Sequence, residues 1–248
     1  MRVAVVGATG RIGRLTSEVL RDGGHDVAPV ARSLGVDVLT GDGLDKALDG
    51  VAAVIDCANT PSQDVTMVVD FFTTTTANLL AAEQRAGVGH HVPLSIVGMA
   101  EPPANPHYAG KLAQEATVER GPVPWTIVRA TQFHDFAAMV ASWTERDGTA
   151  VIAPLLVQPI APADVAAVLA ETAVGEPRRE RLDIAGPETQ DLVDMARRTY
   201  AARGQEIRLV PTWEGPHGVS MAGNALLPGP GARIMPTTFD AWLAAGAQ

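Results

Sequence analysis

Three glycines stand at fixed spacing in the segment GATGRIG, residues 7–13. The segment follows a short apolar run at residues 3–6 and opens a helical pattern. At a helix start, unpaired backbone N–H groups and the helix dipole favour a bound pyrophosphate. Gly7 allows the tight turn, Gly10 the close approach of phosphates, and Gly13 the packing of helix on strand. The segment therefore predicts a dinucleotide-binding turn, with a glycine-rich turn that binds nothing as the alternative.

A second candidate site follows the next apolar run, which ends at residue 30. In dinucleotide-binding folds an acidic residue at this point binds the ribose 2′-hydroxyl of NAD, whereas arginine accommodates the 2′-phosphate of NADP. Here the chain has Arg32 and Ser33 and no acid. A guanidinium makes planar, charge-assisted contacts with phosphate, and Arg11 lies in the glycine segment. We expect NADP(H) as the cofactor; a surface arginine without a ligand is the other interpretation.

These residues need a sheet and helices to hold them. Short apolar runs rich in β-branched residues alternate with helical patterns over the first half of the chain. Most of the runs lack polar alternation, as is typical of strands buried on both faces. The rhythm predicts an α/β fold, a Rossmann-type doubly wound parallel sheet covered by helices. The predicted strands are residues 3–6, 27–30, 36–39, 53–56, 91–97 and 125–128, with helices at residues 12–21 and 68–85.

The pattern loosens beyond residue 132. We therefore expect an NADP(H)-binding domain at residues 1–155 and a smaller C-terminal substrate-side region, residues 156–248, packed on the same domain. Residues 211–236 are dense in Pro and Gly and predict an ordered loop or a lid. Further predicted elements are helices at residues 163–173, 190–203 and 236–245 and strands at residues 181–185 and 206–210.

Composition excludes several classes of function. The 248 residues carry a formal net charge of -9 with a pI near 5.1, so we expect no nucleic-acid partner. Cys57 is the single cysteine, which excludes an internal disulfide and thiolate metal clusters. His90 and His91 are neighbours on a predicted strand and point to opposite faces, so we predict no metal site. No apolar run reaches 18 residues, and we expect a cytoplasmic protein with no membrane partner.

Further motifs follow the glycine segment in a familiar order. They are Arg32, TGD at residues 40–42, SIVG at residues 95–98, YAGKLAQE at residues 108–115 and PWTIVRATQF at residues 124–133. With them the chain resembles the atypical short-chain dehydrogenase/reductases, specifically the NmrA-like NAD(P)H-binding proteins. The resemblance covers most of residues 1–190. It implies a Rossmann sheet that holds NADP(H) across its carboxyl edge, beside a small-molecule substrate.

The resemblance also implies roles for single residues. Lys111 would bind the nicotinamide ribose, Asp42 would lie near the adenine, and Gln132, Phe133 and His134 would face the nicotinamide pocket. Active members of the superfamily use a serine, a tyrosine and a lysine in catalysis, and Ser95, His107, Tyr108 and Lys111 are the candidates here. The implied cofactor contacts are Gly7, Thr9, Gly10, Arg11, Ile12, Gly13, Arg32, Ser33, Asp42, Cys57, Ala58, Asn59, Lys111 and Phe133.

The catalytic spacing departs from that of the superfamily, in which tyrosine stands four residues before lysine. His107 occupies that position, and Tyr108 stands three residues before Lys111. On a helix these two differ from the lysine by about 40° and about 60°, so either can share its face. His107 can donate a proton near neutral pH, or it can merely cap or pack the helix start. Ser95, near a strand end, can bind a substrate carbonyl oxygen or a backbone group.

Two functions of different classes remain. The first is an NADPH-dependent oxidoreductase that transfers hydride to a small apolar carbonyl, quinone or activated alkene. The second is a non-catalytic NADP(H)-binding redox sensor of the NmrA type, which the displaced tyrosine favours. An epimerase or dehydratase that holds NAD is disfavoured by Arg32. Two-fold homodimers are the commonest assemblies, so a homodimer is a prediction from frequency alone.

Overall fold

A seven-stranded parallel sheet forms the centre of the computed structural model, which describes residues 1–99, 105–214 and 218–246. The strand order is β11-β8-β5-β4-β3-β1-β2, and every neighbouring pair is parallel. The sheet thus has the order expected of a doubly wound fold, which confirms the predicted fold class. The strands are β1 Arg2–Val6, β2 Asp26–Val30, β3 Ala53–Asp56, β4 His90–Ile96, β5 Ile127–Ala130, β8 Arg181–Ala185 and β11 Arg233–Ile234.

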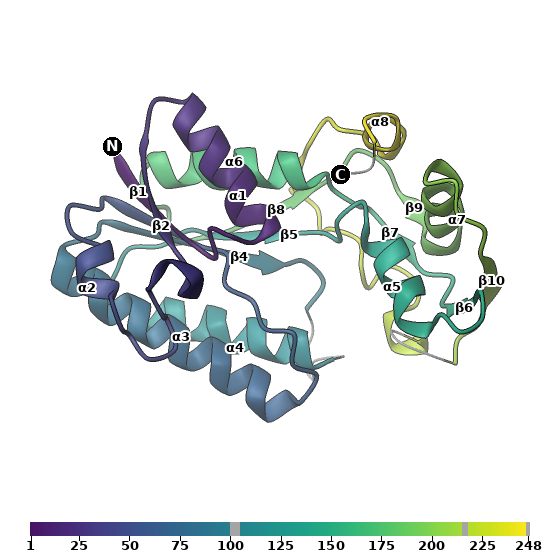
Figure 1. Cartoon of the computed structure of the whole chain (residues 1–248), viewed down its shortest axis with the longest axis horizontal. Coiled ribbons are helices and arrows are strands. Elements are labelled where there is room, and N and C mark those ends of the chain that lie inside the picture. The colour runs from purple at the N-terminus through teal and green to yellow at the C-terminus, as the bar shows by residue number, and fades with distance from the viewer. Residues whose placement is uncertain (100–104, 215–217, 247–248) are drawn as a thin grey trace.

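Helices cover both faces of this sheet, as Figure 1 shows. On one face α1 (Arg11–Asp22) packs beside α6 (Pro162–Val174), and on the other α3 (Val65–Ala86) packs beside α4 (Pro106–Arg120). The short α2 (Leu44–Ala47) lies on the α3 side. Burial on both faces explains why the central strands β1 and β3 consist mostly of Val, Ile and Ala.

The α3 helix contains Thr73 to Thr76, a poor sequence for a helix because β-branched side chains lose rotamer freedom. Two of these threonines, Thr75 and Thr76, are fully buried, and the Thr75 hydroxyl donates to Phe71 O at 2.8 Å. Tertiary packing therefore sustains the helix. Among the described residues, α3 alone is long and apolar enough to cross a membrane, with mean hydropathy 1.3 over its best window. In this fold it is instead a layer on the sheet, packed against α4.

A smaller region lies beside the carboxyl edge of the sheet, on the right in Figure 1. It contains α5 (Phe136–Thr144), α7 (Leu192–Ala202) and α8 (Phe239–Ala244) around their own apolar core. Two small sheets complete it, β6 (Thr149–Ile152) with β10 (Arg208–Pro211) and β7 (Leu156–Val157) with β9 (Gln190–Asp191).

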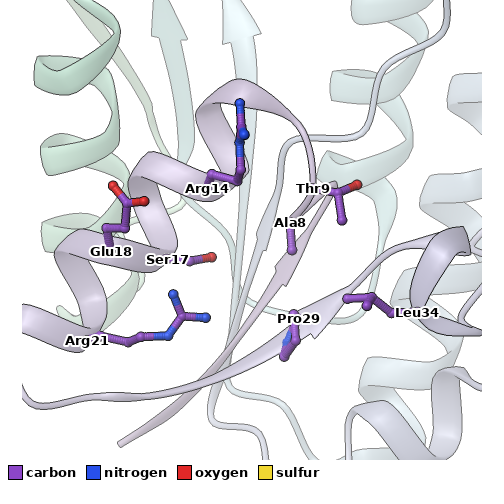
Figure 2. A pocket seen from close by; sticks show the side chains of 8 residues that line it. All are labelled: Ala8, Thr9, Arg14, Ser17, Glu18, Arg21, Pro29 and Leu34. Atoms are coloured by element: carbon purple, nitrogen blue, oxygen red, sulfur yellow. The ribbon is translucent and has the colours of Figure 1, made fainter.

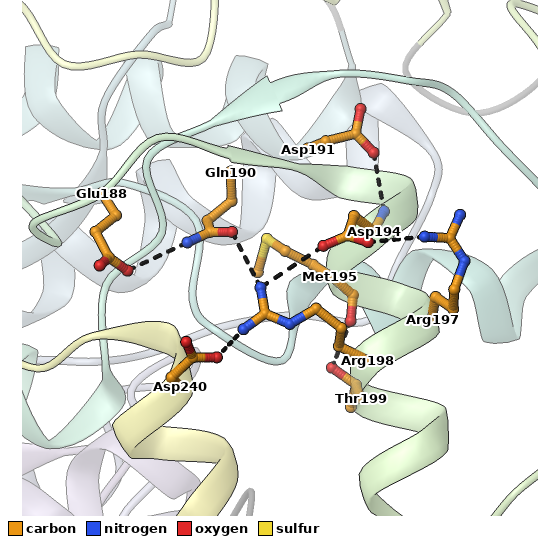
Figure 3. Close-up of polar contacts among 9 residues, drawn as sticks. All are labelled: Glu188, Gln190, Asp191, Asp194, Met195, Arg197, Arg198, Thr199 and Asp240. Carbon is orange, nitrogen blue, oxygen red and sulfur yellow. Dashed lines mark hydrogen bonds and ion pairs between the residues drawn. The ribbon is translucent and has the colours of Figure 1, made fainter.

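A polar network ties α8 to α7 within this region (Figure 3). Arg198 of α7 pairs with Asp240 of α8, and its guanidinium lies 4.8 Å from the centre of the Phe239 ring. The Phe239 and Trp242 rings in turn contact His134, at 5.5 and 5.6 Å between centroids. The C-terminal helix is thereby held against the residues that follow β5.

The predicted strand at residues 36–39 is wrong. The chain turns there, because Asp37 accepts from the Leu39 backbone N–H at 2.8 Å and Gly41 N donates to Asp37 O. Val36 and Val38 are partly buried and pack against the core on the α2 and α3 side of the sheet. This packing explains why the two residues are apolar although they form no strand. The predicted boundary at residue 155 also does not follow the layers. The elements α6, β8 and β11 come after it and lie with the central sheet.

Residues 211–214 and 218–236 form an ordered segment that reaches back to the sheet. It includes the 3-10 helix η2 (Val219–Met221) and places Met221 and Leu226 in the core of the smaller region. The segment lies so close to the residues after β4 that a Cβ at Gly98 would overlap Ala225 O. It therefore covers the end of β4 as part of the folded structure.

Candidate cofactor and substrate site

The glycine turn is built from close backbone contacts. Gly7 has φ +71°, and a Cβ on it would lie 2.8 Å from Cys57 O. A Cβ on Gly13 would lie 2.7 Å from Gly7 C and 2.9 Å from Ala8 Cα, with Gly7 O closer still. Gly10 caps α1 with no side-chain hydrogen bond, and Thr9 and Gly10 are exposed. The helix thus begins at an open turn that only glycine permits, which is the form of a pyrophosphate cradle.

The segment after β3 runs beside this turn, since Cys57 and Ala58 are the nearest neighbours of a Cβ built on Gly7. Burial, with a further contribution from Asp56, raises the pKa of the Cys57 thiol to about 12. The thiol is therefore protonated at neutral pH and unsuited to act as a nucleophile. Asn59 is exposed, and its side-chain oxygen accepts from the Thr60 backbone N–H.

The predicted 2′-phosphate residues do not all lie together. Arg32 and Ser33 are exposed on a 3-10 helix, η1 (Arg32–Leu34), directly after β2. Arg11 lies elsewhere, because its guanidinium pairs with Asp135 at the start of α5. Asp42 is exposed and closes the turn after η1, where its carbonyl accepts from Asp37 N.

A cavity of about 260 Å³ between α1 and β2 adds two arginines that were not predicted from the sequence, Arg14 and Arg21. Arg14 lies at the end of this cavity beside Thr9, and Leu34 of η1 forms part of its wall (Figure 2). The exposed side chains Arg14, Glu18 and Arg21 recur along one face of α1, a spacing that would have indicated this stripe. The cavity is lined by Ala8, Thr9, Arg14, Ser17, Glu18, Arg21, Pro29 and Leu34.

Lys111 is buried on α4 and faces the carboxyl edge of the sheet. Its Nζ donates to Leu94 O at 2.7 Å and to Gln114 Oε1 at 2.8 Å, and lies 4.5 Å from the centre of the Phe72 ring. The Gln114 amide in turn donates to Asp56 Oδ2 at 2.9 Å. Burial lowers the pKa of Lys111 to about 8, although the nearby Asp56 carboxylate opposes the shift.

His107 and Tyr108 diverge from one another at the start of α4. The His107 ring packs edge-on against Phe72, with centroids 5.8 Å apart, on the same side as Lys111. Burial, and then the charge of Lys111, lower the pKa of His107 to about 4. Tyr108 is buried in the core of the smaller region, and its hydroxyl accepts from Gln132 Nε2 at 3.5 Å. Burial raises the pKa of Tyr108.

Ser95 donates to a side chain rather than to a backbone group. Its hydroxyl donates to Glu115 Oε1 at 2.5 Å, and Glu115 also accepts from Arg129 and Arg181. The serine therefore belongs to a buried polar cluster that ties α4 to the strands. Because side chains alternate along a strand, the next residue, Ile96, points the other way and packs against the core that contains Tyr108.

Residues 132–134 follow β5 and lie between the sheet and the smaller region. Gln132 and His134 are buried, and Gln132 Oε1 and His134 Nδ1 have no hydrogen-bond partner among the described residues. Phe133 is half-buried and packs against the core on the α1 side of the sheet. The glycine turn, Lys111 and the Tyr108–Gln132 pair therefore lie along the carboxyl edge of the sheet, with Lys111 and Tyr108 on different sides of α4.

Comparisons with known proteins identify the family and the fold. A family model described as NAD(P)H-binding matches residues 7–175. The photosystem II assembly factor Ycf39 of Synechocystis sp. is 30% identical over 147 residues, which cover 54% of this chain and 45% of that protein. The matched part is thus less than half of the relative's length.

Several solved structures share the whole fold. A triphenylmethane reductase from Citrobacter sp. complexed with NADP(H) has a TM-score of 0.63 and 20% identity, covering 86% of this chain and 80% of that one. An NADPH-dependent quinone oxidoreductase from Escherichia coli has a TM-score of 0.68 and 16% identity, covering 99% and 100%. A short-chain dehydrogenase/reductase superfamily protein from Agrobacterium tumefaciens with bound NAD has a TM-score of 0.70 and 18% identity, covering 100% and 96%.

Proposed function

Because this chain belongs to the NAD(P)H-binding family, we propose that it is an NADPH-dependent reductase that delivers hydride to a small apolar carbonyl, quinone or activated alkene. One observation carries the proposal: the open glycine turn, buried Lys111 and the Tyr108 hydroxyl lie at one edge of the sheet. Ligands of open α/β sheets bind at that edge. The solved structures with NADP(H) or NADPH in their descriptions support the choice of a reductase.

Preference for NADP(H) rests on the residues around the end of β2. Arg32 follows this strand where an acid would select NAD, and Arg14 lies in the cavity beside the glycine turn. Both guanidinium groups can contact a 2′-phosphate by charge-assisted hydrogen bonds. Arg11 is engaged by Asp135 and contributes only where that ion pair opens.

When bound, the dihydronicotinamide supplies the hydride. Lys111 is then the residue that holds the nicotinamide ribose, and its present acceptors, Leu94 O and Gln114 Oε1, fix the Nζ at the sheet edge. Tyr108 provides the proton for the substrate oxygen. His107 is the poorer donor, because with a pKa of about 4 only about one imidazole in a thousand is charged at neutral pH.

A titration of NADPH against NADH tests the proposal. We expect NADPH to bind more tightly to the wild type, and Arg32→Ala and Arg14→Ala each to remove about tenfold of that preference, as a charge-assisted hydrogen bond allows. Arg120→Ala is the matched control, because Arg120 is exposed at the far end of α4. Oxidation of NADPH with a panel of quinones, aldehydes and enones then tests turnover. Failure of the wild type to bind either nucleotide would refute the proposal.

The redox sensor is the second candidate, and the position of Ser95 favours it. Its hydroxyl donates to Glu115, so the serine of the superfamily's catalytic set already has a partner within the protein. Tight NADPH binding without turnover of any panel member would select the sensor. Turnover of any member would exclude a purely non-catalytic role.

A further inference from the structure

Gln132 is a buried amide next to the Tyr108 hydroxyl. It is 7% exposed, it donates to the Tyr108 hydroxyl through Nε2, and its Oε1 has no partner among the described residues. A buried polar atom without a partner costs about 1–3 kcal/mol, so native structures retain few of them. The oxygen is an acceptor, so the contact that orients this amide is the one that its Nε2 makes with the Tyr108 hydroxyl.

The surroundings of this pair are apolar. Tyr108 belongs to the core that includes Met221 and Leu226 from the segment after β10, and Ile96 and Phe136 pack against the same core. Lys111, the nearest cation on α4, points away toward Leu94 O and Phe72. A ligand with a carboxylate or phosphate at this place would lose its hydration without a counter-charge, which is costly. The pair therefore suits a neutral molecule.

The donors are arranged for an oxygen acceptor. A phenol has one O–H donor and two acceptor lone pairs. Gln132 Nε2 occupies a lone pair of the Tyr108 oxygen, which leaves the Tyr108 proton for another acceptor. A carbonyl oxygen is such an acceptor, and it brings no donor proton that would compete with that of Tyr108.

We propose that Gln132 is a positioning residue that holds the Tyr108 hydroxyl toward one carbonyl oxygen of a neutral, apolar substrate. The inference rests on the proposed function and names its substrate class, an uncharged ketone or quinone with an apolar ring system. Met221 and Leu226 belong to the apolar core around Tyr108 on the side of the smaller region.

Two probes that differ in one oxygen test the recognition directly. We would titrate the protein with 1-tetralone and with tetralin by calorimetry, each with and without NADP⁺. Gln132→Leu and Tyr108→Phe are expected to weaken tetralone binding about five- to tenfold, the usual effect of one hydrogen bond, and to leave tetralin binding within about twofold. Thr131→Val is the matched control, because Thr131 is the adjacent buried polar residue and its alternation places it on the other face. It should change neither affinity.

Kinetics separate a positioning role from a structural one. With menadione as oxidant, Gln132→Leu should lower kcat about tenfold, leave the Kd for NADPH and the Tm unchanged, and cause no further loss when Tyr108→Phe is present. Such non-additivity is expected of residues that act through one group. Equal tetralone affinity in wild type and Gln132→Leu, or no tetralone binding to the wild type, would overturn the inference. Absence of nucleotide binding by the wild type would refute the proposed function. The tetralone titration without NADP⁺ would still test the role of Gln132 in that case.

Discussion

Replacement of Gly13 by alanine should destabilise the fold, against the ordinary preference of helices. Gly13 lies inside α1, where alanine is about 1 kcal/mol more favourable than glycine. A Cβ at this position would overlap Gly7 O and lie 2.7 Å from Gly7 C, and ordinary contact begins at 3.4 Å, so the helix must move by more than about 0.7 Å from the turn. The atoms in contact are backbone atoms, which cannot rotate away.

The expected magnitude follows from two opposed contributions. Overpacking of a rigid site costs about 1–3 kcal/mol, and the gain in helix preference offsets about 1 kcal/mol of it. We expect the free energy of unfolding to fall by about 1–2 kcal/mol, the upper half of the difference between these two contributions, because backbone atoms rather than a side chain must move. For a chain of this size, that corresponds to a Tm lower by about 2–8 °C.

Urea denaturation of wild type, Gly13→Ala and Gly10→Ala measures this effect. Gly10 is the matched control, since its φ of -76° suits alanine and its Cβ would lie 3.2 Å from Gly7 O. Gly10→Ala should unfold within about 0.5 kcal/mol of the wild type yet bind NADPH more weakly, because its methyl group lies at the open start of α1. A Gly13→Ala protein as stable as the wild type would refute the packing argument.

Three further predictions concern charged pairs. Asp135→Asn releases Arg11, and NADPH titration should show about two- to fivefold tighter binding that Arg11→Ala abolishes. Lys111 has a pKa of about 8 in the folded protein, against an ordinary value of 10.5. Between these two pH values the unfolded chain binds more protons than the folded one, so the folded wild type gains stability as the pH rises. In urea titrations the unfolding free energy of wild type minus that of Lys111→Met should therefore rise from about pH 8 to about pH 10.5. Burial lowers the pKa of His91, but the Glu83 carboxylate at 2.8 Å from its Nδ1 more than offsets this, so the pKa is raised. Glu83→Gln should therefore lower the free energy of unfolding by about 3–5 kcal/mol below pH 6.5, measured by urea denaturation. The loss should become smaller as the pH rises through the folded pKa of His91.

Local patterns in the sequence carried much of the fold, because the layers of an α/β protein are specified by local periodicity. The strands at residues 53–56 and 181–185 occur with the predicted bounds, and the helix predicted at residues 68–85 extends by a few residues at its N-terminal end. The failure at residues 36–39 has a physical cause. Val36 and Val38 are apolar because they pack under the sheet, and an apolar pattern does not distinguish a strand from a buried turn.

The candidate site was less predictable because side-chain partners come from distant parts of the chain. Arg11 meets Asp135 across 124 residues, and Ser95 meets Glu115 from the neighbouring helix. Neither pairing leaves a local signal. The partner of Tyr108 was equally hidden, since Gln132 comes from a different strand end. Local spacing did predict the glycine turn, which is the backbone part of the site. The geometry of this turn depends on residues 7–13 themselves and on the strands nearest to them.

Tyr108 stands three residues before Lys111 rather than four, and its surroundings differ from those of the lysine. A shift of one residue along a helix turns a side chain by about 100°. At the position four residues before Lys111, His107 lies with Phe72 on the lysine's side, whereas Tyr108 lies within the core of the smaller region. The proposed proton donor therefore cannot depend on the lysine for its orientation, and the Gln132 amide is the group placed to supply it. Lys111 is left to serve the cofactor, so its replacement should impair NADPH binding more than tetralone binding, while replacement of Gln132 should do the reverse.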